Sequence, residues 1–448
     1  MRKRKLFSLL ALVAALSLVA AACGGDEEEP GVTGPTGVTA TGPTAPAVDC
    51  DADPFGCVEV SAGEPIRLGS LLAISGDVAF LGTDSNHGIE LAIDNLDGAL
   101  DATPGQLLGH DVELQQEDDG CSAEGGQAGA TALVADPSIV AVIGTSCSSA
   151  ALGVADTITS DAGYLLLSPS NTNPGLTSEE AHQPFYARTA HNDRIQGAIS
   201  AEFVYNELGI TSAATINDES PYADGLAAAF RQNFEALGGT ITAIEQVNSA
   251  DTDLGPVLRS IAEGEPGLVY APNFPPGCGL SLIQGADIMP AGTTYMGADG
   301  CLETSFVGQV GDPPADYYAS SPDVTVFQGG AYYADEFLPA YEAQYGTEPT
   351  SVFHAHAFDA ANILFDAIEA VAVDDGGTLL IPRTALKDAV LATSGYEGMT
   401  GIVTCTPLGD CATDVTIGIF KYPNWPVEGG EKPTDAVYVD TKSLADVA

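Results

Sequence analysis

The sequence is poor in positive charge. Only 14 of its 448 residues are Lys or Arg, against 62 Asp and Glu, so the formal net charge is −48 at pH 7. A field of this sign repels nucleic acid and anionic lipid surfaces, and we expect no nucleic-acid partner. The acids are scattered through otherwise amphipathic segments, so most of them should be solvated surface rather than catalytic groups.

The motifs of common catalytic and nucleotide-binding sites are missing as well. No P-loop, GxGxxG fingerprint, HExxH pair or GxSxG nucleophile elbow occurs. The nearest approach to an elbow, Gly144-Thr145-Ser146-Cys147-Ser148, lacks the second Gly. His354 and His356 are two residues apart, which on a helix points them to different faces and favours packing or surface roles over metal ligation. We therefore predict a protein that is not an enzyme and uses no cofactor or metal.

One alternative metal site stays open. Asp49, Asp51 and Asp53 could coordinate calcium through their oxygens, but the Gly and terminal Glu of an EF-hand loop are missing. The absence of any CxxC motif argues against a redox or zinc site.

The first residues have the composition of an export signal. Four basic residues, Arg2 to Lys5, precede an uncharged apolar run from Leu6 to Ala22, which is short for a membrane span of roughly 20 residues. The run ends in LVAAACG, which resembles a bacterial lipobox and implies a lipoprotein signal peptide over 1–22, cleavage before Cys23 and lipidation of Cys23. An ordinary secretory signal with an incidental Cys is the alternative.

The mature chain divides into a tether and a globular part. Residues 23–63, rich in acid and then in Gly, Thr, Pro and Ala, predict a flexible linker that carries Cys50 and Cys57. The remaining residues, roughly 385, exceed what one hydrophobic core usually supports, so two lobes are expected.

An even number of cysteines follows Cys23. In an exported chain eight cysteines indicate disulfides, although their number alone does not fix the pairing. The simplest choice is four local pairs: Cys50–Cys57, Cys121–Cys147, Cys278–Cys301 and Cys405–Cys411.

Short apolar runs alternate with helical periods over most of the length. Ile66 to Ile74 predicts a strand, and Ile89, Ile93 and Leu96 after it share one helical face. Further predicted strands are 112–116, 139–143, 164–168, 213–216, 240–245, 268–271 and 293–296. Helices with apolar faces lie between them, and this alternation predicts α/β lobes in which helices flank a parallel sheet.

Two finer predictions concern single elements. Leu152, Ala155 and Ile158 are expected on the inner face of one helix. Gly401 to Lys421 is expected to form two strands around the turn 406–410, which Cys405 and Cys411 flank.

Several segments together resemble one family. They are LGSLLAISGDVAFLG from Leu68, EDDGCSAEGGQAGATALVADPSIVAVIGTSCSSA from Glu117, YLLLSPSNTNPGLT from Tyr164, NDESPYADGL from Asn217 and YMGADG from Tyr295. In this order and spacing they resemble the branched-chain amino-acid binding proteins, which have the type I periplasmic binding fold. The resemblance covers about Ile66 to Lys421.

The resemblance implies a two-lobed protein with three hinge crossovers, near Thr189, Asp323 and Tyr396. Lobe 1 would comprise 64–189 plus 323–396, and lobe 2 would comprise 190–322 plus 397–448. It also implies that a monomer outside the cytoplasm, on the outer face of the cell membrane or in the periplasm, captures a small amino-acid-like ligand and delivers it to an ABC transporter permease.

Two loops of the first lobe are suited to a carboxylate. Ser148 and Ser149 follow the strand 139–143, and Ser170 and Thr172 follow the next strand, where backbone N–H groups and helix N-termini favour anions. The resemblance implies that Ser148 and Thr172 donate to the ligand carboxylate, while the carbonyl of Ser170 accepts from its ammonium. Helix N-capping is the alternative role for these side chains.

The second lobe should supply the counter-charge and the aromatic wall. The resemblance places Asp299 where the family carries a carboxylate for the ammonium, and Tyr222 and Phe274 where it carries pocket tyrosines. Leu81, in the first lobe, stands where an aromatic is usual. A turn at Asp299-Gly300 and simple core packing of Tyr222, Phe274 and Leu81 are the alternatives. Cys278–Cys301 would tie the loops of Phe274 and Asp299 together and lower the ordering cost of binding.

Three other functions were weighed. An amide, urea or aromatic acid is an alternative ligand on the same fold, since a fold does not settle function. A ligand-sensing receptor component would use the same lobes. A lipid-anchored hydrolase would need a nucleophile beside a base, for which no motif is found.

Overall fold

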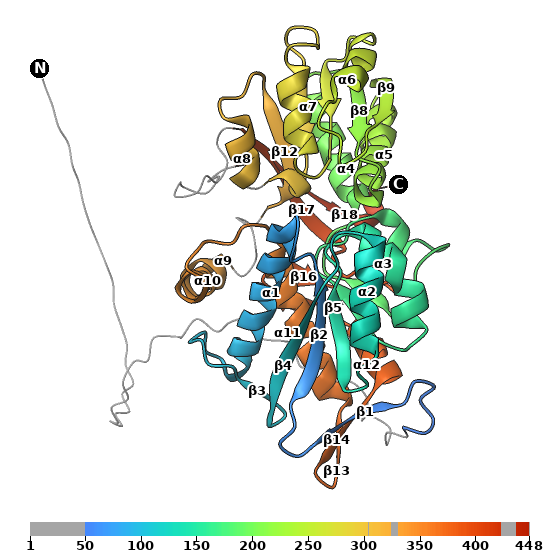
Figure 1. Ribbon diagram of the computed structural model, residues 1–448, viewed down its shortest axis with the longest axis vertical. Coiled ribbons are helices and arrows are strands. Elements are labelled where there is room, and N and C mark those ends of the chain that lie inside the picture. Colours follow the sequence, from blue (N-terminus) through green and yellow to red (C-terminus); the bar gives the residue numbers. More distant parts are fainter. Residues whose placement is uncertain (1–49, 303, 324–329, 423–435, 448) are drawn as a thin grey trace, which may run out of the picture. The chain divides into compact units, whose positions relative to one another are not determined.

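The computed structural model describes residues 50–302, 304–323, 330–422 and 436–447 (Figure 1). The predicted signal peptide, Cys23, most of the predicted linker and Asp49 lie outside the described residues. Within them, no helix is both long enough and apolar enough to cross a membrane.

Lobe 1 is built on a six-stranded sheet in the order β3-β4-β2-β5-β6-β7. All neighbours are parallel except the short β3, which pairs antiparallel with β4. The strands are β2 Ile66–Leu72, β3 Gln106–Leu107, β4 His110–Asp118, β5 Ile139–Gly144, β6 Leu166–Ser168 and β7 Tyr186–Arg188. Strand β5 is buried at every position because helices cover both faces of the sheet.

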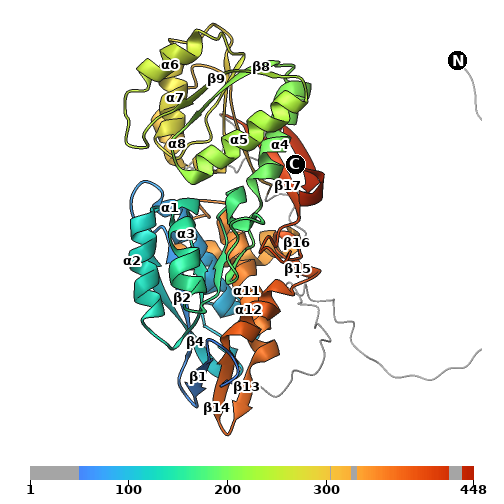
Figure 2. The same ribbon diagram turned by 90° about the vertical axis from the view of Figure 1, so that its right-hand side faces the viewer.

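Those helices divide between the two faces, as Figure 2 shows. One face packs against α2 (Ala123–Val134) and α3 (Ser148–Val154), and the other against α1 (Ala79–Asp94), α11 (Phe353–Val371) and α12 (Arg383–Leu391).

Lobe 2 repeats the plan on a seven-stranded sheet in the order β18-β17-β12-β11-β10-β8-β9. The parallel strands are β8 Ser212–Asn217, β9 Thr240–Gln246, β10 Leu268–Tyr270, β11 Thr294–Gly297 and β12 Tyr317–Pro322, and the antiparallel edge is β17 Asp414–Lys421 with β18 Tyr438–Ser443. Helices α4 (Asp193–Glu202) and α5 (Pro221–Ala236) cover one face (Figure 2). Helices α6 (Gly255–Ala262), α7 (Gly277–Gly285) and α8 (Thr304–Val310) cover the other.

The third crossover lies later in the chain than expected. Strands β15 (Tyr396–Gly398) and β16 (Gly401–Val403) pair with each other, and Met399, Val403 and Cys411 belong to the lobe 1 core. The crossover therefore lies between Cys411 and β17, and the boundary predicted near Tyr396 is wrong. The two strands expected around the turn 406–410 exist but belong to different sheets, because β16 pairs with β15 and β17 pairs with β12 and β18.

Part of the predicted flexible linker is also structured. Strand β1 (Cys57–Ser61) pairs antiparallel with β14 (Thr378–Pro382), which also pairs with β13 (Val373–Asp375), so the linker boundary at 63 is wrong. Asp53 accepts hydrogen bonds from the N–H and hydroxyl of Thr384. Alternating apolar residues in CVEVS, with Val58 and Val60 buried, are the reason that this segment docks.

The inner face predicted for the helix after β5 is confirmed in part. Ala155 is buried and Ile158 packs against the same core as predicted, but Leu152 is 49% exposed and Ala151 and Val154 are buried in its place. Helix α3 passes into a π-helical segment, Ala155–Ser160, whose wider turn breaks the regular spacing on which the prediction rested.

The four local disulfides are present, at Cys50–Cys57, Cys121–Cys147, Cys278–Cys301 and Cys405–Cys411. The last one flanks the turn 406–410. Buried hydrogen bonds and ion pairs also connect distant segments, and one such network centres on Asp84.

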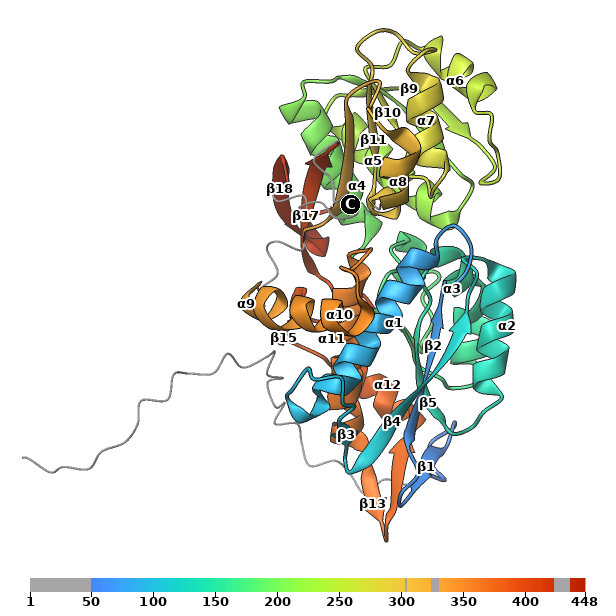
Figure 3. The ribbon, with the colours of Figure 1, turned by 60° about the vertical axis from the view of Figure 1, so that its left-hand side comes forward.

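Asp84 on α1 fastens the segment before α11 to lobe 1. Figure 3 shows α1 beside α11. Its carboxylate accepts from the Tyr341 hydroxyl at 2.6 Å, from the N–H groups of Thr350 and Ser351, and from Nδ1 of His354 at 2.9 Å. Burial alone would raise the pKa of Asp84, but the charge of His354 and these hydrogen bonds hold it below its ordinary value.

Replacing Asp84 by Ala should lower the free energy of unfolding by about 3–5 kcal/mol at pH 7, because His354 and two backbone N–H groups lose a buried acceptor. Because the folded-state pKa lies below 3.8, the stabilisation is present above that pH and is lost as the pH falls through the folded-state value. The difference between the two proteins should therefore shrink below about pH 4. Urea denaturation measures both effects. The exposed Asp156 serves as control, since its Ala variant should change stability by less than about 0.5 kcal/mol.

Candidate functional site

The predicted site residues follow the carboxyl ends of parallel strands, where ligands bind in open α/β sheets. In lobe 1, Ser148 and Ser149 begin α3 after β5, Ser170 and Thr172 lie on the loop after β6, and Leu81 lies in α1 after β2. In lobe 2, Tyr222 lies at the start of α5 after β8, Phe274 on the loop after β10, and Asp299 in the short helical turn after β11.

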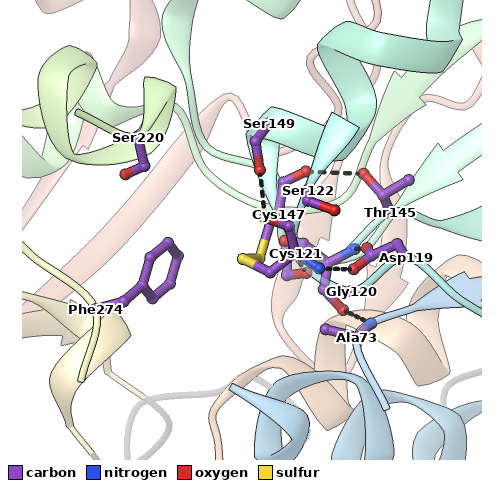
Figure 4. Close-up of a disulfide and its surroundings, with 12 residues drawn as sticks. Ala73, Asp119, Gly120, Cys121, Ser122, Thr145, Cys147, Ser149, Ser220 and Phe274 are labelled. Atoms are coloured by element: carbon purple, nitrogen blue, oxygen red, sulfur yellow. Dashed lines mark hydrogen bonds between the residues drawn. A yellow bond between two sulfur atoms is a disulfide. The ribbon is translucent and has the colours of Figure 1, made fainter. Parts of the chain in front are cut away.

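The β5–α3 loop is held by a buried carboxylate next to the Cys121–Cys147 disulfide (Figure 4). Asp119 accepts from the N–H of Cys121 and from the N–H of Ser146, both at 2.7 Å. Burial raises the pKa of Asp119 to about 6, although these backbone donors pull it down. The loop is thereby fixed before any ligand arrives.

Ser149 is used within this loop. Its hydroxyl donates to the carbonyl of Cys121 at 2.9 Å, as Figure 4 shows. Ser148 is 2% exposed, and its hydroxyl oxygen accepts from the N–H of Asn173 at 3.3 Å. The N-cap of α3 is Cys147 and makes no side-chain cap bond, so N-capping does not explain Ser148.

The loop after β6 lies directly beside Ser148. The hydroxyl of Ser170 donates to the carbonyl of Ser146 at 3.0 Å, which joins the two loops. Thr172 is 1% exposed, and its hydroxyl has no hydrogen-bond partner within the described part of the chain. Its carbonyl accepts from the N–H of Asp193, the first residue of α4 in lobe 2.

Arg188 anchors the loop after β6 through hydrogen bonds to its backbone carbonyls. Its fully buried guanidinium donates to the carbonyls of Asn171 and Asn173 and pairs with Asp410 at 2.6 Å. The N–H of Arg188 donates to Gly409, and the N–H of Cys411 donates to the carbonyl of Arg188. The first crossover, the third crossover and the ligand loop therefore share one buried ion pair.

Lobe 2 supplies a buried acid at the predicted position. Asp299 is 7% exposed and accepts from Nε2 of Gln196 at 2.7 Å and from the Tyr222 hydroxyl at 3.1 Å. Burial raises the pKa of Asp299, while His191, Gln196 and Tyr222 act in the opposite direction. Asp299 is therefore part of a buried polar network and does more than form a turn.

A second buried acid, Asp193, was not predicted. Neither of its carboxylate oxygens has a hydrogen-bond partner within the described residues. Burial and the nearby charge of Asp299 raise its pKa well above the ordinary value, although Thr172 and Arg188 pull it down. An acid in the first turn of a helix ordinarily complements the helix dipole, so its position alone gave no signal of a site.

Within the described residues, the cationic groups that act on the two carboxylates are Arg188 and His191. Arg188 is paired with Asp410, and burial lowers the pKa of His191, which favours its neutral form at pH 7. Buried charges in proteins are ordinarily paired. This corner is therefore suited to a positively charged group.

Other buried polar atoms in lobe 2 lack partners among the described residues. They are the Tyr270 hydroxyl, the Ser200 and Ser321 hydroxyls and both side-chain atoms of Asn273. Burial raises the pKa of Tyr270, and the charges of Asp193 and Asp299 raise it further, while the hydroxyls of Ser200 and Ser320 lower it, so the Tyr270 hydroxyl lies near the two acids. Since buried polar atoms are usually satisfied, a cluster of orphaned ones is typical of a polar binding site.

Apolar side chains from both lobes form a cluster next to the site. Leu81 is 3% exposed in a cluster with Val78, Cys147 and Phe353, and Phe274 of lobe 2 packs against this cluster. The ring of Phe274 stands across from the disulfide in Figure 4. The rings of Phe274 and Tyr222 are 4.9 Å apart, and Cys278–Cys301 ties the two loops of lobe 2.

The structure thus groups Ser148, Ser170, Thr172 and Leu81 in lobe 1 and Tyr222, Phe274 and Asp299 in lobe 2, with Asp193 between the two sets. A cavity of about 270 Å³ elsewhere in lobe 1, lined by α1 and β4 residues, includes none of them.

Comparisons with known proteins agree with this architecture. The family model described as periplasmic binding protein matches residues 65–412. Leu/Ile/Val-binding protein BraC3 of Rhizobium johnstonii is 28% identical over 362 residues, which cover 80% of this chain and 91% of that protein. The leucine-, isoleucine-, valine-, threonine- and alanine-binding protein of Pseudomonas aeruginosa is 25% identical over 312 residues, covering 69% of this chain and 79% of that one.

Solved structures share the fold. A leucine-binding protein of Thermotoga maritima matches with a TM-score of 0.69 at 22% identity, covering 85% of this chain and 100% of its own. A branched-chain amino acid transporter substrate-binding protein of Streptococcus pneumoniae, in complex with isoleucine, matches with a TM-score of 0.69 at 24% identity, covering 85% and 99%. The predicted type I periplasmic binding fold is confirmed, and the named relatives are binding proteins, not enzymes. Because the family model spans most of the chain, the protein belongs to the periplasmic binding protein family.

Proposed function

We propose that this protein captures an aliphatic α-amino acid between its two lobes and delivers it to the permease of an ABC importer. The observation that carries the proposal is the pair of buried carboxylates, Asp193 and Asp299, which face hydroxyl and N–H donors of lobe 1. A zwitterionic amino acid would present its ammonium to the two acids and its carboxylate to the hydroxyl and N–H donors of lobe 1.

The carboxylate end would bind at the lobe 1 loops. The Thr172 hydroxyl meets no partner at hydrogen-bond geometry among the described residues, and the Ser148 hydroxyl, which accepts from the N–H of Asn173, would donate its own proton to the ligand. Both stand beside fixed backbone N–H groups at a helix start, which favours an anion. Ser149, whose hydroxyl serves the Cys121 carbonyl, would support the loop and leave the ligand contact to Ser148.

The ammonium end would bind at Asp299 and Asp193, with Tyr222 and the Ser170 carbonyl beside them. An ammonium has three donors, enough for both acids and one neutral acceptor. The ligand side chain would lie against Leu81, Phe274 and the Cys121–Cys147 disulfide, an apolar surface that suits an aliphatic group. The names of the relatives, which bind leucine, isoleucine and valine, support the same class.

A ligand held by both lobes binds more tightly to the closed arrangement and so shifts the hinge equilibrium toward it. The closed monomer would then dock on the permease outside the cytoplasm. The lipobox-like segment supports lipidation of Cys23 and attachment to the outer face of the membrane.

An aromatic acid is the main competing ligand, since a related fold from Rhodopseudomonas palustris, at 20% identity, is known in complex with benzoate. A benzoate anion would leave Asp193 and Asp299 without a counter-charge in a buried setting, which is unfavourable. The acids therefore favour the zwitterion.

Calorimetric titration with aliphatic, polar and aromatic amino acids tests the proposal, and leucine should bind saturably. Asp299→Asn should weaken leucine binding at least about tenfold, because the ammonium loses a buried charged acceptor. Asp287→Asn, the same change at an exposed site of lobe 2, should bind like the wild type. Unchanged binding in Asp299→Asn, or a wild type that binds benzamide but no amino acid, contradicts the assignment.

Asp193→Asn should stabilise the ligand-free protein by about 1–2 kcal/mol at pH 7 while weakening leucine binding, because it removes an unpaired buried charge. The folded-state pKa is raised, so the cost of the carboxylate grows as the pH rises from 3.8 through that pKa. The increase in the free energy of unfolding of Asp193→Asn over the wild type should therefore be absent near pH 3.8 and reach its full size only above the folded-state pKa of Asp193. Urea denaturation at several pH values measures it, and a variant less stable than the wild type throughout would show that Asp193 has a structural role.

A further inference from the structure

Asn173 is the residue whose side chain hydrogen-bonds the ligand loop of lobe 1 to α5 of lobe 2, in addition to the backbone bond between Thr172 and Asp193. Its Nδ2 donates to the carbonyl of Pro221, the first residue of α5, at 2.5 Å. Within lobe 1, its N–H donates to the Ser148 hydroxyl oxygen and its carbonyl accepts from Arg188. One residue therefore connects Ser148 to the helix that carries Tyr222.

Local structure does not require this side chain to reach lobe 2. The Oδ1 atom of Asn173 accepts from the N–H of Gly175 at 2.8 Å and caps the short helical turn at Pro174–Thr177. An Asp would cap that turn equally well. Among the described residues, the amide nitrogen of Asn173 donates only to the Pro221 carbonyl of lobe 2.

Gly225 makes room for the contact. In an α-helix the N–H of residue i+4 points to the carbonyl of residue i, so Gly225 flanks the Pro221 carbonyl one turn along α5. A Cβ on Gly225 would lie 2.7 Å from Nδ2 of Asn173 and 3.1 Å from Cδ of Pro174. Glycine is a weak helix former in the interior of α5, and the approach of Asn173 is the reason it is tolerated there.

We propose that Asn173 and Gly225 form an inter-lobe latch that slows ligand release, an inference that rests on the proposed function. The contact joins protein atoms alone, so it strengthens the closed arrangement whichever amino acid is bound. A bond that exists only when the lobes meet stabilises the closed state relative to the open one, and its loss appears mainly in the dissociation rate. Asn173 is thus a positioning residue that acts through Ser148 and α5.

The decisive variant is Gly225→Ala, measured by chase of bound radiolabelled leucine and by equilibrium binding. Leucine should dissociate about tenfold faster, with an association rate within about twofold of the wild type. The thermal midpoint of the ligand-free variant should be unchanged or higher, because Ala is the better helix former. Weaker leucine binding without a loss of thermal stability would show that the substitution removes the latch and does not damage the fold.

The matched control is Gly308→Ala in α8 of the same lobe, where a Cβ meets nothing within 4 Å among the described residues. It should leave both rates unchanged. Asn173→Asp keeps the acceptor for Gly175 but loses the donor to Pro221, and it should also speed release. Combined with Gly225→Ala it should have less than the additive effect, because both changes remove one contact.

The outcomes separate the two proposals. A wild type that binds leucine together with a Gly225→Ala variant that releases it at the wild-type rate overturns the latch and leaves the proposed function intact. Additive effects of the two changes overturn it as well. A wild type that binds no amino acid overturns the proposed function, and the latch with it.

Discussion

The buried ion pair between Arg188 and Asp410 is the constraint on which the site depends. Its guanidinium is surrounded by protein, and its carboxylate partner lies 222 residues later in the chain. Breaking a buried pair of this kind is costly because one charge is left unmatched. The pair joins the segments of the first and third crossovers, and Arg188 also donates to the carbonyls of Asn171 and Asn173. The crossovers and the ligand loop are therefore tied to one buried ion pair.

Five buried acids of this protein fall into two groups. Asp84, Asp119 and Asp359 each accept two or more hydrogen bonds from backbone N–H groups or hydroxyls, and these acids hold loops in place. Among the described residues, Asp193 accepts from no backbone N–H and only one hydroxyl, that of Thr172, acts on it, and Asp299 accepts from the side chains of Gln196 and Tyr222. In a chain with 62 acids, the pattern of hydrogen bonding therefore distinguishes the carboxylates proposed to bind the ligand, whereas their number does not.

Much of the fold and part of the site could be predicted from the sequence. Buried strands such as Ile139–Gly144 are visible as apolar runs, and Ser148 and Thr172 stand directly after two of them. Asp299 was identified through resemblance to a family motif. Asp193 could not be, because an acid at the start of a helix has an ordinary local role, and only the packing of both lobes deprives it of partners. The predicted inward orientation of Leu152 and the predicted position of the third crossover were wrong for a related reason. A π-helical segment and the membership of a strand in one sheet or another depend on tertiary contacts that spacing does not encode.

The docking of the N-terminal segment on lobe 1 has a mechanical consequence. Helix α11 begins at Phe353, beside Leu81, and its 19 residues carry the chain roughly 28 Å before it enters β13. Strand β1 joins that distant sheet, and Arg383, which follows β14, bonds to the carbonyls at the start of β5, opposite the end that bears Ser148. Any force transmitted along the chain from residue 50 therefore enters the molecule at the base of one lobe, remote from the crossovers. If the chain is anchored through Cys23 and closes on its ligand as proposed, closure of the second lobe would not depend on the tension or length of the attachment.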